Sequence, residues 1–195
     1  MNRTKHQTNA RRLRTLLLRI VFPSLLLATS VYAQKSQPPA NYADNGACPF
    51  ECCTYRRWSV VKDTVIYKQR SESSGVAFRV RKGEHVTGIT GVVITLTPGK
   101  AVVRKATTIG EGRRQAKLKP GDVLYLLHYL GEGFFRIWFN GRIYDNEMPD
   151  PSDANSKINV LNQPKTVWWM KVKNSRNQVG WTRQNDNFGD MDACG

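Results

Sequence analysis

The sequence has few acidic residues, few histidines and no long apolar run. Asp and Glu together number 15 against 30 Lys and Arg, and only three histidines occur in 195 residues. Of these, His85 and His128 lie beyond the N-terminal segment, and neither stands at the spacing of a zinc motif or of a catalytic nucleophile and its base. We therefore expect no catalytic residues, no metal and no other cofactor.

The longest N-terminal apolar run, Ile20–Ala28, is about half of the ~20 residues that a spanning helix needs. Pro23 interrupts this run, and six Lys and Arg with no acidic residue precede it. This arrangement predicts a signal peptide over residues 1–33, cleaved between Ala33 and Gln34, and hence export to the periplasm or the extracellular space. The alternative is an uncleaved segment, which would be the chain's only contact with a membrane.

The remaining chain is basic, but unevenly so. Without the six N-terminal cations, 24 Lys and Arg stand against 15 Asp and Glu. Residues 55–120 hold 15 basic and four acidic residues, whereas residues 121–195 hold eight and nine. A basic half favours polyanionic partners, although a solvated surface explains it equally well. We expect no nucleic acid, because most aromatics lie away from the densest basic cluster, around Arg113 and Arg114, and because the protein is exported.

Cysteine is also scarce, and its placement is informative. All four cysteines follow the predicted signal segment, as suits an oxidising compartment. Three pairings are available, and a bond between the neighbours Cys52 and Cys53 would be strained. Both other pairings join one cysteine of the CPFECC motif to Cys194. We predict two disulfides formed by Cys48, Cys52, Cys53 and Cys194.

Short apolar or alternating runs separated by turn residues follow the first cysteine, and none shows extended helical spacing. Asn140-Gly141 between two such runs is a strong hairpin signal. The pattern predicts an all-β fold of short antiparallel strands in one or two small units. The expected units are a flexible leader at 34–47, a first β unit at 48–106, a linker or loop at 107–119, and a second β unit at 120–195 with a long loop at 145–164.

The second unit resembles a bacterial SH3-like domain, a small barrel found in exported proteins. The resemblance rests on Lys119–Asp122, Gly131–Ile137, and Trp169–Lys173 followed by Gly180-Trp181-Thr182. The first unit is similar with less specific motifs. The resemblance implies one or two SH3-like barrels that bind ligands, often cell-wall peptides, and it implies no catalysis.

Alternation along the strands sorts the aromatic side chains, because successive residues of a strand point to opposite faces. Phe135, Ile137 and Phe139 form one apolar set, and Trp168, Met170 and Val172 form another; both should face a core. The opposite faces carry tryptophan beside cations, an arrangement that suits sugar rings or peptides. Burial in a second small core is the alternative. The candidate ligand-binding residues are Trp138, Trp169, Arg136, Lys171 and Lys173.

These observations favour a non-catalytic binding protein of the cell envelope, with wall peptide or glycan as its partner. An interaction or inhibitor protein that uses the basic face against another envelope protein is the second hypothesis. A wall hydrolase is the third, and it has the least support, because the cysteines are expected in disulfides and His128 is expected at the edge of a core.

Overall fold

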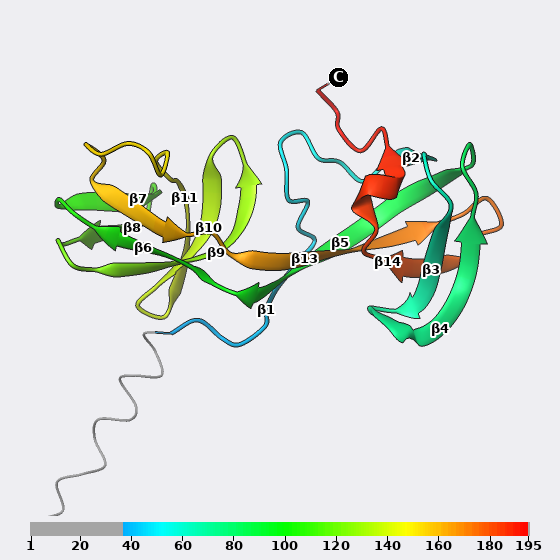
Figure 1. Ribbon diagram of the computed structural model, residues 1–195, viewed down its shortest axis with the longest axis horizontal. Helices are drawn as coiled ribbons and strands as arrows, with labels where there is room; N and C mark the ends of the chain where they lie inside the picture. The colour runs from blue at the N-terminus through cyan, green and yellow to red at the C-terminus, as the bar shows by residue number, and fades with distance from the viewer. Residues whose placement is uncertain (1–36, 195) are drawn as a thin grey trace, which may run out of the picture.

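The computed structural model describes residues 37–194, and strands dominate this part of the chain (Figure 1). The one other regular element described is a 3-10 turn, Asn185–Asn187. All strand pairs among these residues are antiparallel, so the all-β prediction is confirmed, while the SH3-like form of the barrels stays a prediction. The predicted signal peptide, residues 1–33, and residues 34–36 of the leader lie outside the described residues.

An eight-stranded, curled sheet forms one half of the molecule, which we call the eight-stranded lobe. Its order is β15-β2-β5-β13-β14-β3-β4, and β1 pairs with the later part of β5. The strands are β1 Tyr42–Asn45, β2 Arg57–Val60, β3 Thr64–Gln69, β4 Ser71–Val80, β5 His85–Thr97, β13 Lys165–Lys173, β14 Val179–Thr182 and β15 Phe188–Gly189.

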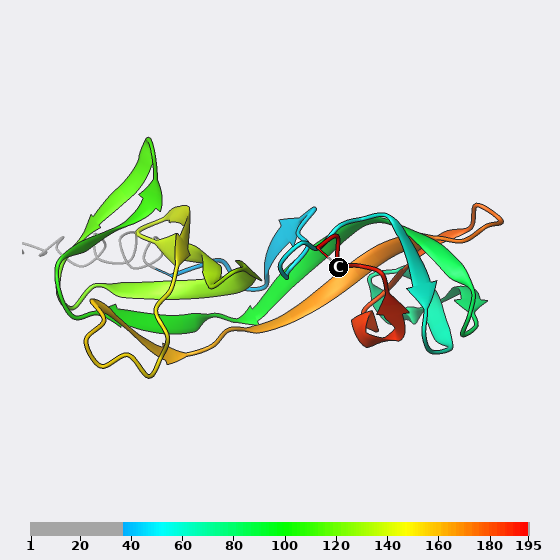
Figure 2. The same cartoon turned by 90° about the horizontal axis from the view of Figure 1, so that it is seen from above.

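The other half, the five-stranded lobe, has a sheet of order β11-β10-β9-β6-β12 and a separate hairpin of β7 and β8. Figure 2 shows this hairpin standing out from the five-stranded sheet. The strands are β6 Gly99–Val103, β7 Thr107–Glu111, β8 Arg114–Leu118, β9 Val123–Gly131, β10 Phe134–Phe139, β11 Arg142–Glu147 and β12 Ile158–Asn162.

The chain builds the five-stranded lobe as an insertion between β5 and β13. These two long strands run side by side along the middle of the elongated molecule (Figures 1 and 2). Their register places Lys165 opposite Thr97, so the chain returns to the eight-stranded lobe next to the point where it left.

Strand pairing therefore runs across the expected division of the chain. β13 and β14, from the expected second unit, pair with β5 and β3, from the expected first unit. The expected linker at 107–119 is the hairpin β7–β8, in which Ile109 and Leu118 are buried. The expected loop at 145–164 contains the end of β11 and all of β12. The expected flexible leader contains β1, which pairs with β5 from Tyr42 to Asn45.

Each lobe has its own hydrophobic core. Trp58, Trp168 and Met170 lie in the core of the eight-stranded lobe. Leu124 and Ile137 lie in that of the five-stranded lobe. The alternation predicted both inward-facing sets, with Phe135 only partly buried at the edge of its core.

The four cysteines form two disulfides, Cys48–Cys53 and Cys52–Cys194, with Cα–Cα distances of 5.5 and 5.6 Å. The prediction that one CPFECC cysteine reaches Cys194 is confirmed. The disulfide Cys52–Cys194 ties the beginning of the eight-stranded lobe to the end of the chain. Beside it, the backbones of Cys53 and Asp192 pair in an isolated antiparallel β-bridge. Two disulfides with no free cysteine favour a non-cytoplasmic, oxidising compartment.

Candidate functional site

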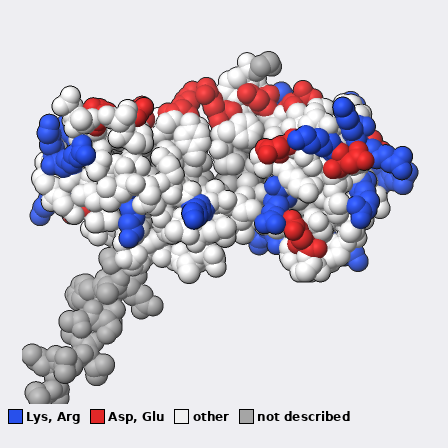
Figure 3. Space-filling view, viewed as in Figure 1, with Lys and Arg blue, Asp and Glu red and all other residues white. Residues whose placement is uncertain are grey.

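The structure divides the five candidate ligand-binding residues between two surfaces. Trp138 and Arg136 lie on β10 of the five-stranded lobe, whereas Trp169, Lys171 and Lys173 lie on β13 of the eight-stranded lobe. On the face shown in Figure 3, basic side chains gather at the two ends of the molecule and acidic side chains follow one long edge.

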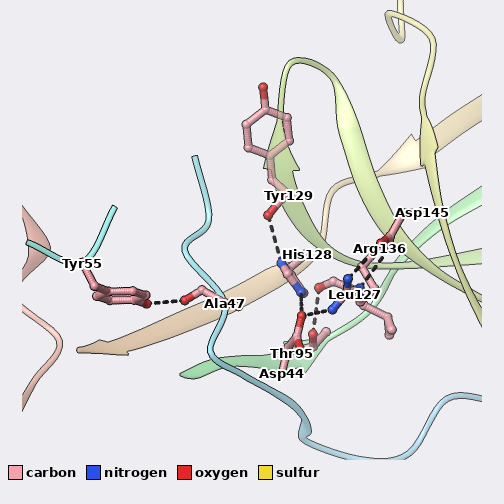
Figure 4. Close-up of polar contacts among 9 residues, drawn as sticks. All are labelled: Asp44, Ala47, Tyr55, Thr95, Leu127, His128, Tyr129, Arg136 and Asp145. Atoms are coloured by element: carbon pink, nitrogen blue, oxygen red, sulfur yellow. Dashed lines mark hydrogen bonds and ion pairs between the residues drawn. The ribbon is translucent and has the colours of Figure 1, made fainter. Parts of the chain in front are cut away.

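Arg136 is held by two carboxylates. Its Nε and Nη2 donate to the two carboxylate oxygens of Asp145 at 2.9 and 2.8 Å, and its Nη1 contacts Asp44 (Figure 4). Hydrogen bonding to Asp145, with the charges of Asp145 and Asp44, raises the pKa of Arg136 against the lowering effect of burial. Because its charge is already compensated, Arg136 is a poor choice for capturing an anionic ligand.

Asp44 also joins His128 to this network. His128 is 1% exposed, and its Nε2 lies 2.7 Å from Asp44 Oδ2 while its Nδ1 lies 2.9 Å from the carbonyl oxygen of Tyr129. A carbonyl can only accept, so Nδ1 donates there. Both ring nitrogens are thus occupied, which leaves His128 no free nitrogen to serve as a general base. The expectation of a satisfied histidine at the edge of a core is confirmed.

Trp169 lies on the face that alternation predicted, beside Lys171, but it is 6% exposed. It sits in mid-sheet opposite Val92, and the guanidinium of Arg183 lies 5.9 Å from its ring centroid. Of the two alternatives drawn from the sequence, Trp169 therefore follows burial and not exposure, with Arg183 over its ring. Lys171 instead approaches Trp181, with its Nζ 5.7 Å from that ring's centroid.

Trp138 is partly exposed and lies in a groove of about 410 Å³, which we call the arginine groove. Two of its arginines, Arg113 and Arg114, come from the tip of hairpin β7–β8, and Arg142 begins β11. The remaining lining residues are Gln115, Gly141, Ile143 and Tyr144.

Local turns place these arginines. Asn140 and Gly141 have φ values of 49° and 80°, as the Asn-Gly hairpin signal predicts, and they direct Arg142 back beside Trp138. Gly110 on β7 donates its backbone N–H to Asn146 Oδ1 at 3.0 Å, which holds hairpin β7–β8 against β11. The expectation that aromatics lie away from the basic cluster is thus wrong for Trp138, because sequence spacing did not show that hairpin β7–β8 folds beside β11.

The arginine groove carries positive charge without a matching carboxylate. Within residues 37–194, none of Arg113, Arg114 and Arg142 has an acidic group within 4.0 Å; the ion pairs found there involve His128, Arg136 and Arg183. The indole Nε1 of Trp138 is buried and has no hydrogen-bond partner among the same residues. The groove thus offers guanidinium donors beside an aromatic ring.

One cluster in the described part of the chain has the composition of a metal site: Glu51, Cys52 and Cys194. The two sulfur atoms are bonded to each other, so neither is a thiolate that could bind a metal. In the segment after β11, Asp150 accepts hydrogen bonds from the hydroxyl and the backbone N–H of Ser152, which lower its pKa.

Between residues 37 and 194 there is no helix of the length and apolarity needed to cross a bilayer. Comparison of the chain with protein-family models, with curated proteins and with solved structures found no match.

Proposed function

We propose that this protein is a non-catalytic binding module of the cell envelope and that its arginine groove binds wall peptides through their carboxylates. The observation that carries the proposal is that three arginines without acidic partners among the described residues line one groove with Trp138. Like charges gathered at one surface attract anions.

The chemistry of the groove favours carboxylates. Each guanidinium presents a planar fork that matches a carboxylate in a bidentate geometry. Trp138, Ile143 and Tyr144 supply apolar contact for the aliphatic part of a peptide. Wall peptides combine free carboxylates with short aliphatic side chains, so we prefer peptide to glycan as the ligand of this groove.

Two features support the envelope location. The disulfides favour an oxidising compartment, and the predicted signal peptide supplies a route to it. The resemblance to bacterial SH3-like domains agrees with wall-peptide binding, and it remains an expectation from short motifs.

The test is co-sedimentation of the oxidised protein with purified cell-wall sacculi at low and moderate salt. We expect retention at both salt concentrations, and a loss of about tenfold or more in the double variant Arg113→Gln/Arg114→Gln, because charge-assisted hydrogen bonds are worth roughly 1.5–3 kcal/mol each. The matched control is Lys117→Gln/Lys119→Gln, which removes the same charge from exposed positions just outside the groove.

Equal losses in the two double variants would reduce the binding to nonspecific attraction between the basic protein and the wall, and so would retention at low salt alone. No retention at either salt concentration would overturn wall binding and would favour an acidic protein of the envelope as the partner.

A further inference from the structure

A second aromatic surface lies on the eight-stranded lobe, around Trp181. The ring of Trp181 is partly exposed and lies between two cations: Arg70 Cζ is 5.5 Å and Lys171 Nζ 5.7 Å from its centroid. The strand register places Lys171 next to Trp181, because Lys171 of β13 lies opposite Trp181 of β14. On its other side, Trp181 lies opposite Tyr67 of β3.

The two cations at Trp181 have no acidic partner within 4.0 Å among residues 37–194. The neighbouring arginine differs in this respect: Arg183 pairs with Glu72 at 2.8 Å while it covers Trp169. Two like charges on one indole repel each other, and cation–π attraction of about 0.5–1 kcal/mol at exposed sites offsets this only in part. The pair of cations gives this surface a positive potential that attracts anions.

Beside Trp181 is a hollow of about 630 Å³. Ala43 and Ile94 supply apolar contact in its lining, and Asn41 and Gln69 supply side-chain amides. These amides provide both donors and acceptors, which is what the hydroxyl groups of a sugar require.

We propose that this surface, the Trp181 hollow, binds an acidic pyranose, a sugar ring that carries a carboxylate, within an acidic polysaccharide. The sugar ring contacts the indole and the apolar side chains of the hollow, its carboxylate meets Arg70 and Lys171, and its hydroxyls bond with the side-chain amides of Asn41 and Gln69. Ligand sites of this kind combine apolar or aromatic contact with a few placed polar groups.

The Trp181 hollow is separate from the arginine groove. The two share no lining residue and lie on different sheets. The inference therefore does not depend on wall-peptide binding, and either site can fail without the other.

The experiment is calorimetric titration of the full oxidised chain with trigalacturonate and, separately, with its methyl ester. The ester keeps the sugar ring and removes the charge. We expect the acid to bind, with an affinity that falls as salt rises, and the ester to bind about tenfold more weakly or more. Trp181→Ala and Arg70→Gln/Lys171→Gln should each lower the affinity for the acid about tenfold or more.

The control variant is Lys68→Gln/Arg79→Gln, which removes two exposed charges from β3 and β4 outside the hollow. It should bind trigalacturonate like the original protein. If Trp181→Ala fails to fold, as judged by circular dichroism, the charge variant at Arg70 and Lys171 decides the question. The proposal is overturned if the acid does not bind, if both charge variants weaken binding equally, or if only Arg113→Gln/Arg114→Gln abolishes it.

Discussion

At the scale of single residues, Asp44 links parts of the chain that are far apart in sequence. Its carboxylate serves His128 and Arg136, which lie 84 and 92 residues further along the chain. Neither contact could be predicted from the neighbouring sequence, because Asp44 belongs to a polar segment whose composition predicts a flexible leader. Its position is determined by strand β1 pairing with β5, which is a long-range event.

We expect Asp44→Asn to destabilise the protein by about 2–4 kcal/mol, because the buried His128 and the partly buried Arg136 would lose the anion between them. Urea unfolding at neutral pH measures this. The matched control is Asp145→Asn, which removes the other carboxylate of Arg136; that group is 45% exposed, and its loss should cost less than about 1 kcal/mol. Equal costs would show that Asp44 is no more important than a surface ion pair.

Tyr55 gives a prediction about alkaline pH. Its hydroxyl donates to the carbonyl of Ala47 and accepts from Trp168 Nε1 at 3.3 Å, and burial raises its pKa to about 12 from a usual value of 10.0. The unfolded chain therefore loses this proton at lower pH than the folded protein. Stability from Tyr55 is complete below pH 10.0 and should fall as the pH rises from there towards about 12.

The measurement compares urea midpoints of the original protein and Tyr55→Phe between about pH 9 and about pH 11. Tyr55→Phe is less stable at the lower pH, because two hydrogen bonds are lost. The difference between the two proteins should shrink as the pH rises. A constant difference would mean that Tyr55 ionises at the same pH in the folded and unfolded states.

At the scale of strands, the sequence predicted which side chains of a strand point into a core better than it predicted which segments pack beside them. Alternation correctly predicted that Ile137, Phe139, Met170 and Val172 point into cores, because that depends only on the two-residue repeat of a strand. It could not decide between exposure and burial for Trp169, since the ring is covered by Arg183, which follows the neighbouring strand β14. The arginine groove was missed for the same reason, because its residues come from strands β8, β10 and β11 and from the turns that precede β8 and β11.

Strand β5 contains a position where only glycine fits. A Cβ atom on Gly88 would run into the indole of Trp58, which lies fully buried on the neighbouring strand β2. We expect Gly88→Ala to cost about 1–3 kcal/mol through overpacking of this core. Thr87→Ala, at the exposed neighbouring position, should cost less than about 1 kcal/mol. Guanidinium unfolding followed by tryptophan fluorescence distinguishes these outcomes, and similar costs would contradict close packing at Gly88.

At the scale of the whole molecule, the two disulfides should contribute unequally. Cys52–Cys194 spans 142 residues, whereas Cys48–Cys53 spans five. In the chain-entropy model, the longer loop stabilises the folded state by about 3 kcal/mol more than the shorter one. We therefore expect Cys52→Ser/Cys194→Ser to lower the free energy of unfolding more than Cys48→Ser/Cys53→Ser. The reverse order, in denaturant unfolding of both variants, would show that local geometry around the CPFECC motif outweighs loop closure.

The insertion of one lobe between two neighbouring strands has an evolutionary consequence. Because Thr97 and Lys165 face each other, a short turn could replace residues 98–164 and leave β5 and β13 as one ordinary hairpin. In its strand pairing, the five-stranded lobe is in this sense a cassette, joined to the other lobe by side-chain contacts such as those of Asp44 with His128 and Arg136. Changes within the inserted lobe that keep these contacts leave the strand pairing of the eight-stranded lobe in place.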